Sequence, residues 1–355
     1  MAAGDAPGAF LAYERRSNKG GCMVGEISRR DFFVTTRDGV RIAIREVADE
    51  GAPDRAVPMI LMHGTRIPGL SEYDLDVPNG SLAEDLARRG HRCYIVDGRG
   101  FGRSERPPEM EAPPAKTRPL YRTLELTRDL DAAVDHLCDT SGHDRVGMFG
   151  WGVGGTCVMA YAALNPEKVS HLVLYVMMYG AAGNHPKFCH GSQWEDPSRP
   201  GHFNRAHFGN YTFNAVGMLT REWDRQIPIA DKTAWRDPAI VKAFEQALID
   251  GDPTAKDRDP PTYRSPNGML EDLFLMGIGH KLVDASQVYA RVMIVRPEFD
   301  TLSQKDDMDA LAADLINAEE VLYWQPENTT HYILFDRPER GRDAMLGAME
   351  AFLEC

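Results

Sequence analysis

The pattern of apolar and polar residues along the chain predicts short buried strands that alternate with helices. Apolar runs of strand length cover residues 57–62, 93–96, 146–149, 169–176, 292–295 and 320–324. Helical spacing or helix signals fall between and after them, at 81–89, 126–137, 156–164, 308–315 and 345–352. Strands that alternate with helices favour a mostly parallel sheet covered on both faces, an α/β fold.

The first part of the chain departs from this alternation. Two short apolar runs, 32–34 and 40–44, flank the turn signal Arg37-Asp38-Gly39, which indicates a β-hairpin. Residues 1–30 are polar and contain glycine, and we expect an N-terminal arm that is mobile or wraps over the surface.

Between residues 180 and 289 the alternation stops, and aromatic, histidine and proline residues become frequent. One helix is legible there, with Asp237 as its N-cap and Pro238 at its first position. The sequence therefore predicts a mainly helical cap or lid at 180–289, inserted into a core formed by 31–179 and 290–355.

Composition narrows the class of protein and of partner. The chain has 355 residues, of which 43% are hydrophobic and 26% charged, as in ordinary soluble domains. A net charge of −13 argues against nucleic acid or an anionic membrane as a partner. We find no apolar run long enough for a transmembrane helix and no signal peptide at the start. The six cysteines are scattered, which favours reduced thiols and a cytoplasmic location.

No zinc-binding or phosphate-loop spacing occurs in the sequence, and we expect neither a metal nor a cofactor. The expected partner is a small molecule, while the sequence leaves a homo-oligomer open.

The most informative stretch is Gly150-Trp151-Gly152-Val153-Gly154. It follows a predicted buried strand and precedes a predicted helix rich in small residues. A strand, a sharp glycine turn and a helix make up the context of the nucleophile elbow, G-x-S-x-G. Gly150 and Gly154 fit the tight turn, but Gly152 stands where the nucleophile is expected and has no side chain.

Other predicted strands are also followed by turns that carry candidate functional residues, at His63-Gly64-Thr65, Asp300 and, after the last strand, His331. Functional groups gather at the carboxyl ends of strands in sheets of this kind. The chain order elbow, acid, histidine is that of the α/β-hydrolase triad. With the loop Asp97-x-Arg99-Gly100-x-Gly102-x-Ser104, these pieces resemble the α/β-hydrolase superfamily over nearly all of residues 30–355.

The resemblance implies a capped serine esterase or lactonase with an acyl-enzyme mechanism through residue 152. In it, His331 is the general base and Asp300 fixes its tautomer. The backbone N–H groups of Thr65 and Val153 form the oxyanion hole. The implied substrate is an apolar ester, lactone or thioester.

Gly152 has two explanations. In the first, a serine nucleophile has been replaced, and the chain is an inactivated variant that traps its substrate. In the second, glycine is the natural residue. The chain is then a lyase, cyclase or cofactor-free oxygenase that works through His331 and Asp300, or a ligand-binding pseudoenzyme.

Several other residues have a structural and a functional interpretation. His63 is expected to shape the oxyanion turn, and Cys157 is not expected to replace the nucleophile. Arg66 either faces the pocket, where it meets a substrate carboxylate, or lies at the surface. Trp151 either packs beside the elbow or contacts the substrate. Glu298 is a rival to Asp300 and is expected to be structural.

Overall fold

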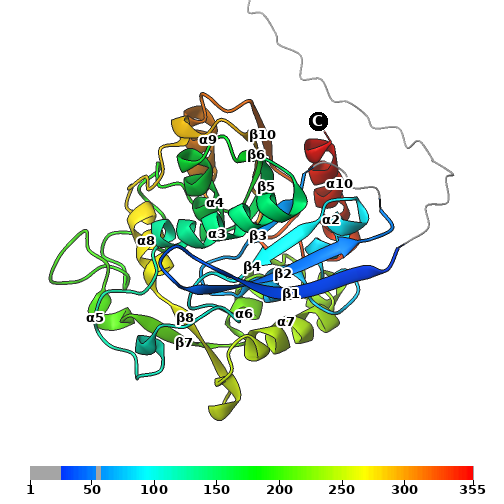
Figure 1. Cartoon of the computed structure of the whole chain (residues 1–355). Coiled ribbons are helices and arrows are strands. Elements are labelled where there is room, and N and C mark those ends of the chain that lie inside the picture. Colours follow the sequence, from blue (N-terminus) through cyan, green and yellow to red (C-terminus); the bar gives the residue numbers. More distant parts are fainter. Residues whose placement is uncertain (1–24, 53–56, 355) are drawn as a thin grey trace, which may run out of the picture.

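An eight-stranded sheet forms the centre of the protein (Figure 1). The computed structural model describes residues 25–52 and 57–354. The strand order is β1-β2-β4-β3-β5-β6-β9-β10, and the six strands from β4 to β10 in this order run parallel. The strands are β1 (Ile27–Thr35), β2 (Arg41–Asp49), β3 (Met59–Met62), β4 (Cys93–Val96), β5 (Val146–Trp151), β6 (Val169–Tyr175), β9 (Arg291–Val295) and β10 (Glu320–Trp324). The predicted α/β arrangement with a mostly parallel sheet is confirmed.

The predicted hairpin is also present, but its strands are longer than the apolar pattern indicated. β1 pairs antiparallel with β2 from Ile27 to Thr35, so the strand begins inside the segment 1–30 that we predicted as an arm. The extra length is polar, and ion pairs such as Arg45–Asp31 at 2.8 Å hold it across the two strands. Charged side chains on an edge strand replace the alternating apolar residues by which a strand is recognised in the sequence. The remainder of the predicted arm, residues 1–24, lies outside the described residues.

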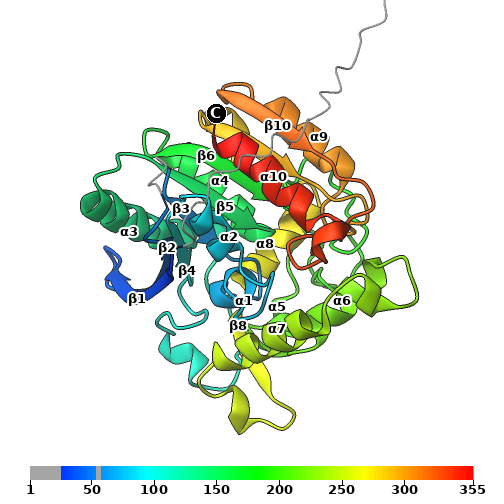
Figure 2. The same cartoon turned by 90° about the vertical axis from the view of Figure 1, so that its right-hand side faces the viewer.

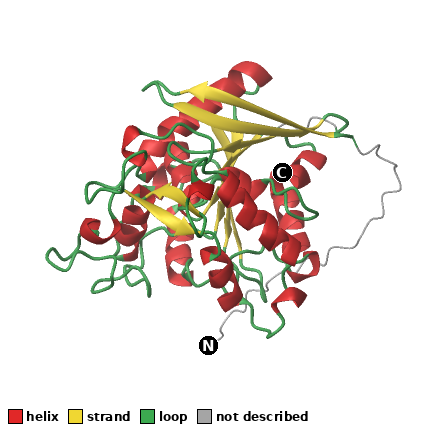
Figure 3. Ribbon diagram, turned by 90° about the horizontal axis from the view of Figure 1, so that it is seen from below, coloured by secondary structure: helices red, strands yellow, loops and turns green. Residues whose placement is uncertain are grey.

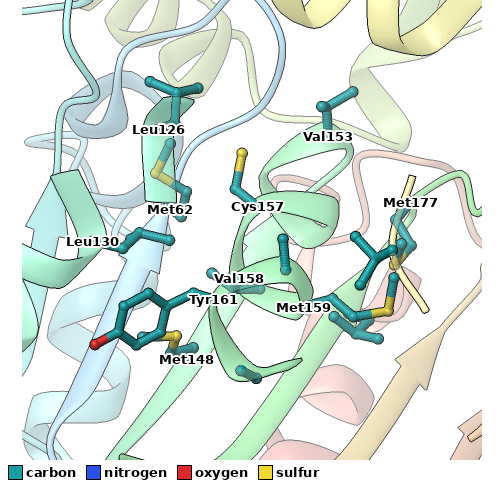
Figure 4. Close-up of a cluster of buried hydrophobic side chains, with 14 of the residues drawn as sticks. Met62, Leu126, Leu130, Met148, Val153, Cys157, Val158, Met159, Tyr161 and Met177 are labelled. Atoms are coloured by element: carbon teal, nitrogen blue, oxygen red, sulfur yellow. The ribbon is translucent and has the colours of Figure 1, made fainter. Parts of the chain in front are cut away.

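Helices cover both faces of the sheet (Figure 3). One face packs against α3 (Thr123–Ser141), α4 (Val153–Leu164) and α9 (Lys305–Asp314). The other packs against α1 (Gly69–Tyr73), α2 (Leu82–Arg88) and α10 (Arg342–Leu353). Figure 4 shows the core of the first face, where Val153, Cys157 and Tyr161 of α4 lie among Leu126, Leu130 and methionines of the strands. A rigid α4 follows from this burial and fixes the elbow at its start.

The segment 180–289 contributes no strand to the large sheet. It holds α5 (Arg205–Phe208), β7 (Tyr211–Ala215), α6 (Met218–Gln226), α7 (Pro238–Asp250), β8 (Thr262–Pro266) and α8 (Gly268–Gly277). We call it the inserted segment. Its helices α6 and α7 lie beside one end of the sheet in Figure 2. Asp237 caps α7 as predicted, since its side chain accepts a hydrogen bond from the N–H of Ala239 at 2.8 Å.

Two features of the inserted segment were not predicted. β7 and β8 form an antiparallel ribbon, so the segment is not purely helical. The strands are short, and 46 residues separate Ala215 from Thr262, so the sequence carries no hairpin signal. In addition, α8 packs onto α3 and α4, with Met269 and Phe274 in the same hydrophobic cluster as Leu126. This end of the inserted segment is therefore continuous with the core.

Within the described ranges, no helix has the length and apolar character needed to cross a bilayer. Cys93, Cys138, Cys157 and Cys189, the cysteines of that part of the chain, are free thiols.

The close packing around Gly154 of the elbow predicts how a substitution there affects stability. A Cβ on Gly154 would overlap the main-chain oxygens of Met62 and His63, and backbone atoms have no room to move aside. We expect Gly154→Ala to lower the free energy of unfolding by about 3 kcal/mol in urea denaturation, because both collisions lie in the packed core. Gly347→Ala is the control, since nothing lies within 4 Å of that Cβ, and alanine there should be neutral or stabilising. Equal changes in the free energy of unfolding for the two substitutions would show that close packing does not require glycine at position 154.

Candidate active site

The turn between β5 and α4 has the geometry of a nucleophile elbow. Gly152 adopts φ +55° and ψ −121°, a conformation strained for a residue with a side chain. Unlike a Cβ on Gly150 or Gly154, a Cβ on Gly152 would meet no atom within 4 Å. Gly150 and Gly154 are thus required by close packing, whereas position 152 has open space for a side chain.

His331 and Asp300, predicted as base and acid, lie in contact. Nδ1 of His331 is 3.0 Å from Oδ2 of Asp300, and both side chains are buried. The other oxygen of Asp300 accepts hydrogen bonds from the N–H groups of Leu302 at 2.7 Å and Ser303 at 3.1 Å. Asp300 therefore caps the following turn and orients the imidazole at once. The rival Glu298 is exposed and instead accepts a hydrogen bond from the N–H of Asn328.

The main chain of His331 is fixed from both sides. Its N–H donates to Oε1 of Gln226 at 2.7 Å, and its carbonyl accepts from the hydroxyl of Tyr175 at 2.5 Å. Gln226 ends α6, so the inserted segment reaches the histidine loop directly. Neither residue was singled out from the sequence, because a lone glutamine and a strand tyrosine carry no motif.

The remaining ring nitrogen of His331 also has a partner. The indole Nε1–H of Trp151 lies 3.1 Å from Nε2 of His331, and both residues are buried. An indole N–H only donates, so Nε2 accepts and the proton sits on Nδ1, facing Asp300. This is the neutral tautomer that a general base requires. Trp151 thus binds the nitrogen that a nucleophile at position 152 would use.

The turn after β3 brings Thr65 beside the elbow, and Thr65 and Val153 both line the same cavity. Val153 is the first residue of α4, where backbone N–H groups have no intrahelical acceptor. His63 shapes the turn, as expected: its Nδ1 lies 2.8 Å from the carbonyl of Gly64, and its Nε2 accepts from the N–H of Gly98 at 3.0 Å. Burial lowers the pKa of His63, which favours the neutral ring that this pattern needs.

Glu72 is a buried carboxyl behind the same turn that sequence reasoning missed. Its Oε2 accepts a hydrogen bond from the N–H of Gly64 at 2.8 Å, while Oε1 has no hydrogen-bond partner. Burial raises the pKa of Glu72 well above its ordinary value, which favours the neutral form of the carboxyl.

A cavity of about 700 Å³ connects these groups. Gly152, His331, Thr65 and Arg66 are on its wall. The cavity lies where the chain order of the strands reverses, between β3 and β5, which is the place where open α/β sheets bind ligands. Much of the wall is apolar, formed by residues such as Ile67, Val176, Met178, Phe188, Trp194 and Leu270.

The other sequence candidates lie outside the cavity. Asp97, Arg99 and Ser104 hold their loop by hydrogen bonds, among them Ser104 Oγ to the carbonyl of Asp97 at 2.5 Å and Arg99 Nε to Asp129 at 2.8 Å. Cys157 points into the core, and burial raises the pKa of its thiol well above the ordinary value. Among the described residues, no group of three or more histidine, cysteine or acidic side chains is placed to hold a metal ion.

Asp336 binds Thr330 in the loop that carries His331, and the pKa of this carboxyl predicts how stability depends on pH. Asp336 accepts hydrogen bonds from Thr330 Oγ1 and Trp223 Nε1, each at 2.8 Å, and burial raises its pKa to about 7. Between about pH 4 and 7 the folded chain then keeps a proton that the unfolded chain releases. Stability is fully present below this window, falls as pH rises through it, and is level above it.

We expect Asp336→Asn to reduce this fall, measured as the difference in free energy of unfolding between pH 5 and pH 8. Asp129, whose pKa is also raised, keeps its own contribution in the variant. An unchanged difference would show that Asp336 does not hold the proton.

Comparison with known proteins identifies the family. A family model described as the alpha/beta hydrolase fold matches residues 57–338, which include the elbow, Asp300 and His331. The chain belongs to the alpha/beta hydrolase family. This membership supports a hydrolase.

The hydrolase chain is 34% identical over 105 residues to the poly(3-hydroxyalkanoate) polymerase subunit PhaC of Haloferax mediterranei. That match covers 29% of this chain and 18% of the polymerase subunit, so the chain spans less than a fifth of this relative.

Solved hydrolases share the fold over most of the chain. An esterase from Thermogutta terrifontis superposes with a TM-score of 0.57 at 16% identity, covering 91% of this chain and 99% of that one. A thioesterase domain from the curacin biosynthetic pathway gives 0.56 at 13% identity, with 92% and 100% covered. At such low identity these likenesses show the fold alone.

Proposed function

We propose that this hydrolase acts on an apolar carboxylic ester, lactone or thioester through an acyl-enzyme on residue 152, and that the chain with Gly152 is its inactivated form. The main support is the open space at position 152, in the elbow conformation, on the wall of the cavity that also holds His331. A serine there attacks the carbonyl carbon while His331 takes its proton, and Asp300 stabilises the imidazolium. His331 then gives the proton to the departing alcohol or thiol as the ester or thioester bond breaks, and water hydrolyses the acyl-enzyme that remains. The N–H groups of Thr65 and Val153 stabilise the oxyanion, and the inserted segment serves as the cap.

A second candidate rests on the hydrogen bond from Trp151 to His331. If glycine is natural at 152, Trp151 supplies the partner that a buried Nε2 would otherwise lack. The chain is then a ligand-binding protein, or an enzyme in which His331 abstracts a proton from the ligand without a nucleophile, as in a lyase, cyclase or cofactor-free oxygenase.

The experiment compares the chain with its Gly152→Ser and Gly152→Ala forms on short p-nitrophenyl esters. Turnover in the serine form alone supports the first candidate. Turnover in the glycine form that His331→Ala removes supports proton abstraction, and ligand binding without turnover in any form supports a binding protein. The cytoplasmic location and a homo-oligomer remain predictions.

A further inference from the structure

Arg66 is a cation on the cavity wall without an anionic partner. It follows the oxyanion turn, and its side chain is half-buried. Its Nη1 reaches only neutral acceptors, Oδ1 of Asn214 at 3.4 Å and Sδ of Met218 at 3.3 Å. Its Nε and Nη2 donate to no described protein group. A guanidinium stays charged in proteins and presents a flat fork of donors that matches a carboxylate.

Asn214 holds the contact to Arg66 in place. Its Nδ2 donates to Oγ of Ser265 at 2.8 Å and to the carbonyl of Tyr263 at 3.3 Å, both on β8. The amide oxygen of Asn214 is therefore directed toward Arg66 by the ribbon of β7 and β8. This ribbon gives the guanidinium one fixed contact and leaves its other nitrogens free for a ligand.

A second cation shares this wall. Lys187 lines the same cavity and is exposed, and its Nζ lies 5.6 Å from the centre of the Phe188 ring. Neither Lys187 nor Arg66 forms an ion pair with any residue in the described ranges. Both side chains line the one cavity, so the two cations act on the same region.

The acidic groups of the cavity offset these cations only in part, because Glu222, which attracts Lys187, is shared with Arg225. Glu222 is already paired with Arg225, whose Nη1 lies 2.6 Å from its Oε1. Burial raises the pKa of Glu72, which favours its neutral form, and the histidines His207 and His331 add no negative charge. The cavity therefore carries an excess of positive charge inside a chain whose net charge is −13.

We propose that Arg66, assisted by Lys187, is a subsite for the carboxylate of an amphipathic ligand whose apolar body fills the rest of the cavity. This narrows the substrate class and so rests on the proposed function, although binding itself needs no nucleophile. Two sources offer the same chemistry: the acid released by ester hydrolysis, and a separate carboxylate carried by the ester.

The test uses the chain as it is, with Gly152, and measures binding by isothermal titration calorimetry. Octanoate represents the released acid, and 1-octanol is its uncharged match. Monooctyl succinate represents an anionic ester, and methyl octyl succinate is its uncharged match. We expect a carboxylate to bind about tenfold more tightly than its match, since a charge-assisted hydrogen bond contributes that much.

Arg66→Gln should remove this preference and leave the uncharged ligands unchanged. Arg221→Gln is the control, because Arg221 is an exposed cation on α6 that does not line the cavity. Lys187→Gln, at an exposed position that folding does not depend on, should reduce the preference by a smaller factor, and less so at high salt.

The pair of ligands that shows the preference identifies its source. Equal binding of charged and uncharged ligands, or equal losses in Arg66→Gln and Arg221→Gln, would overturn the subsite. Failure of the proposed function looks different: the Arg66-dependent preference persists, while Gly152→Ser hydrolyses no ester. Conversely, ester hydrolysis without any anionic preference leaves the function standing and removes the subsite.

Discussion

Gly152→Ser is expected to raise kcat on p-nitrophenyl esters by at least about 10³-fold over the chain with glycine, since a serine triad loses that much or more without its nucleophile. The hydroxyl would enter the open space at position 152, where a Cβ meets nothing within 4 Å. It must compete with Trp151 for Nε2 of His331, which lies 3.1 Å from the indole nitrogen. Stopped-flow measurement of nitrophenol release would also show a burst if the acyl-enzyme accumulates.

Gly152→Ala separates the hydroxyl from the backbone. Both substitutions place a Cβ at φ +55°, and each should lower the free energy of unfolding by about 1–3 kcal/mol. Only serine should gain activity. An equal rate in the alanine and serine forms would mean that the esters are not attacked by residue 152.

Asp300→Asn, made in the Gly152→Ser form, is expected to lower kcat by about 10⁴-fold with little change in the fold. An amide N–H facing Nδ1 of His331 moves the ring proton to Nε2. Nε2–H then faces the indole N–H of Trp151, so the substitution also breaks the hydrogen bond between Trp151 and His331. The 15N chemical shifts of the imidazole would report the change of tautomer directly.

Glu298→Gln is the matched control for Asp300→Asn. Glu298 is exposed, lies two residues before Asp300 and accepts a hydrogen bond from the N–H of Asn328 at 2.7 Å. Its substitution should leave kcat within about twofold, because a surface hydrogen bond contributes little. A large loss from Glu298→Gln together with a small loss from Asp300→Asn would exchange the roles of the two acids.

The sequence predicts the central sheet well because buried parallel strands are continuous apolar runs. β4 and β10 coincide with the predicted 93–96 and 320–324, and the structure begins β9 one residue early. The polar half of β1 was not predicted, because cross-strand ion pairs rather than apolar burial stabilise it. β7 and β8 were not predicted, because they pair residues that are far apart in the sequence and local patterns do not record such pairing.

The candidate site divides in the same way. Asp300 and His331 each follow a strand and occur in the chain order of a known motif, so the sequence indicates both. In the structure, Nδ1 of His331 lies 3.0 Å from Oδ2 of Asp300. The partners that tune them come from elsewhere in the chain and carry no pattern of their own. Gln226 and Glu72 are of this kind, and the donation from Trp151 to His331 depends on a ring orientation that only coordinates reveal.

The hydrogen bond from His331 to Gln226 joins the histidine loop to the inserted segment. Gln226 ends a helix of the inserted segment, and its Oε1 accepts a hydrogen bond from the N–H of His331 at 2.7 Å. If α6 were displaced, the N–H of His331 would lose this acceptor. The position of α6 therefore bears directly on the alignment of the imidazole with Asp300.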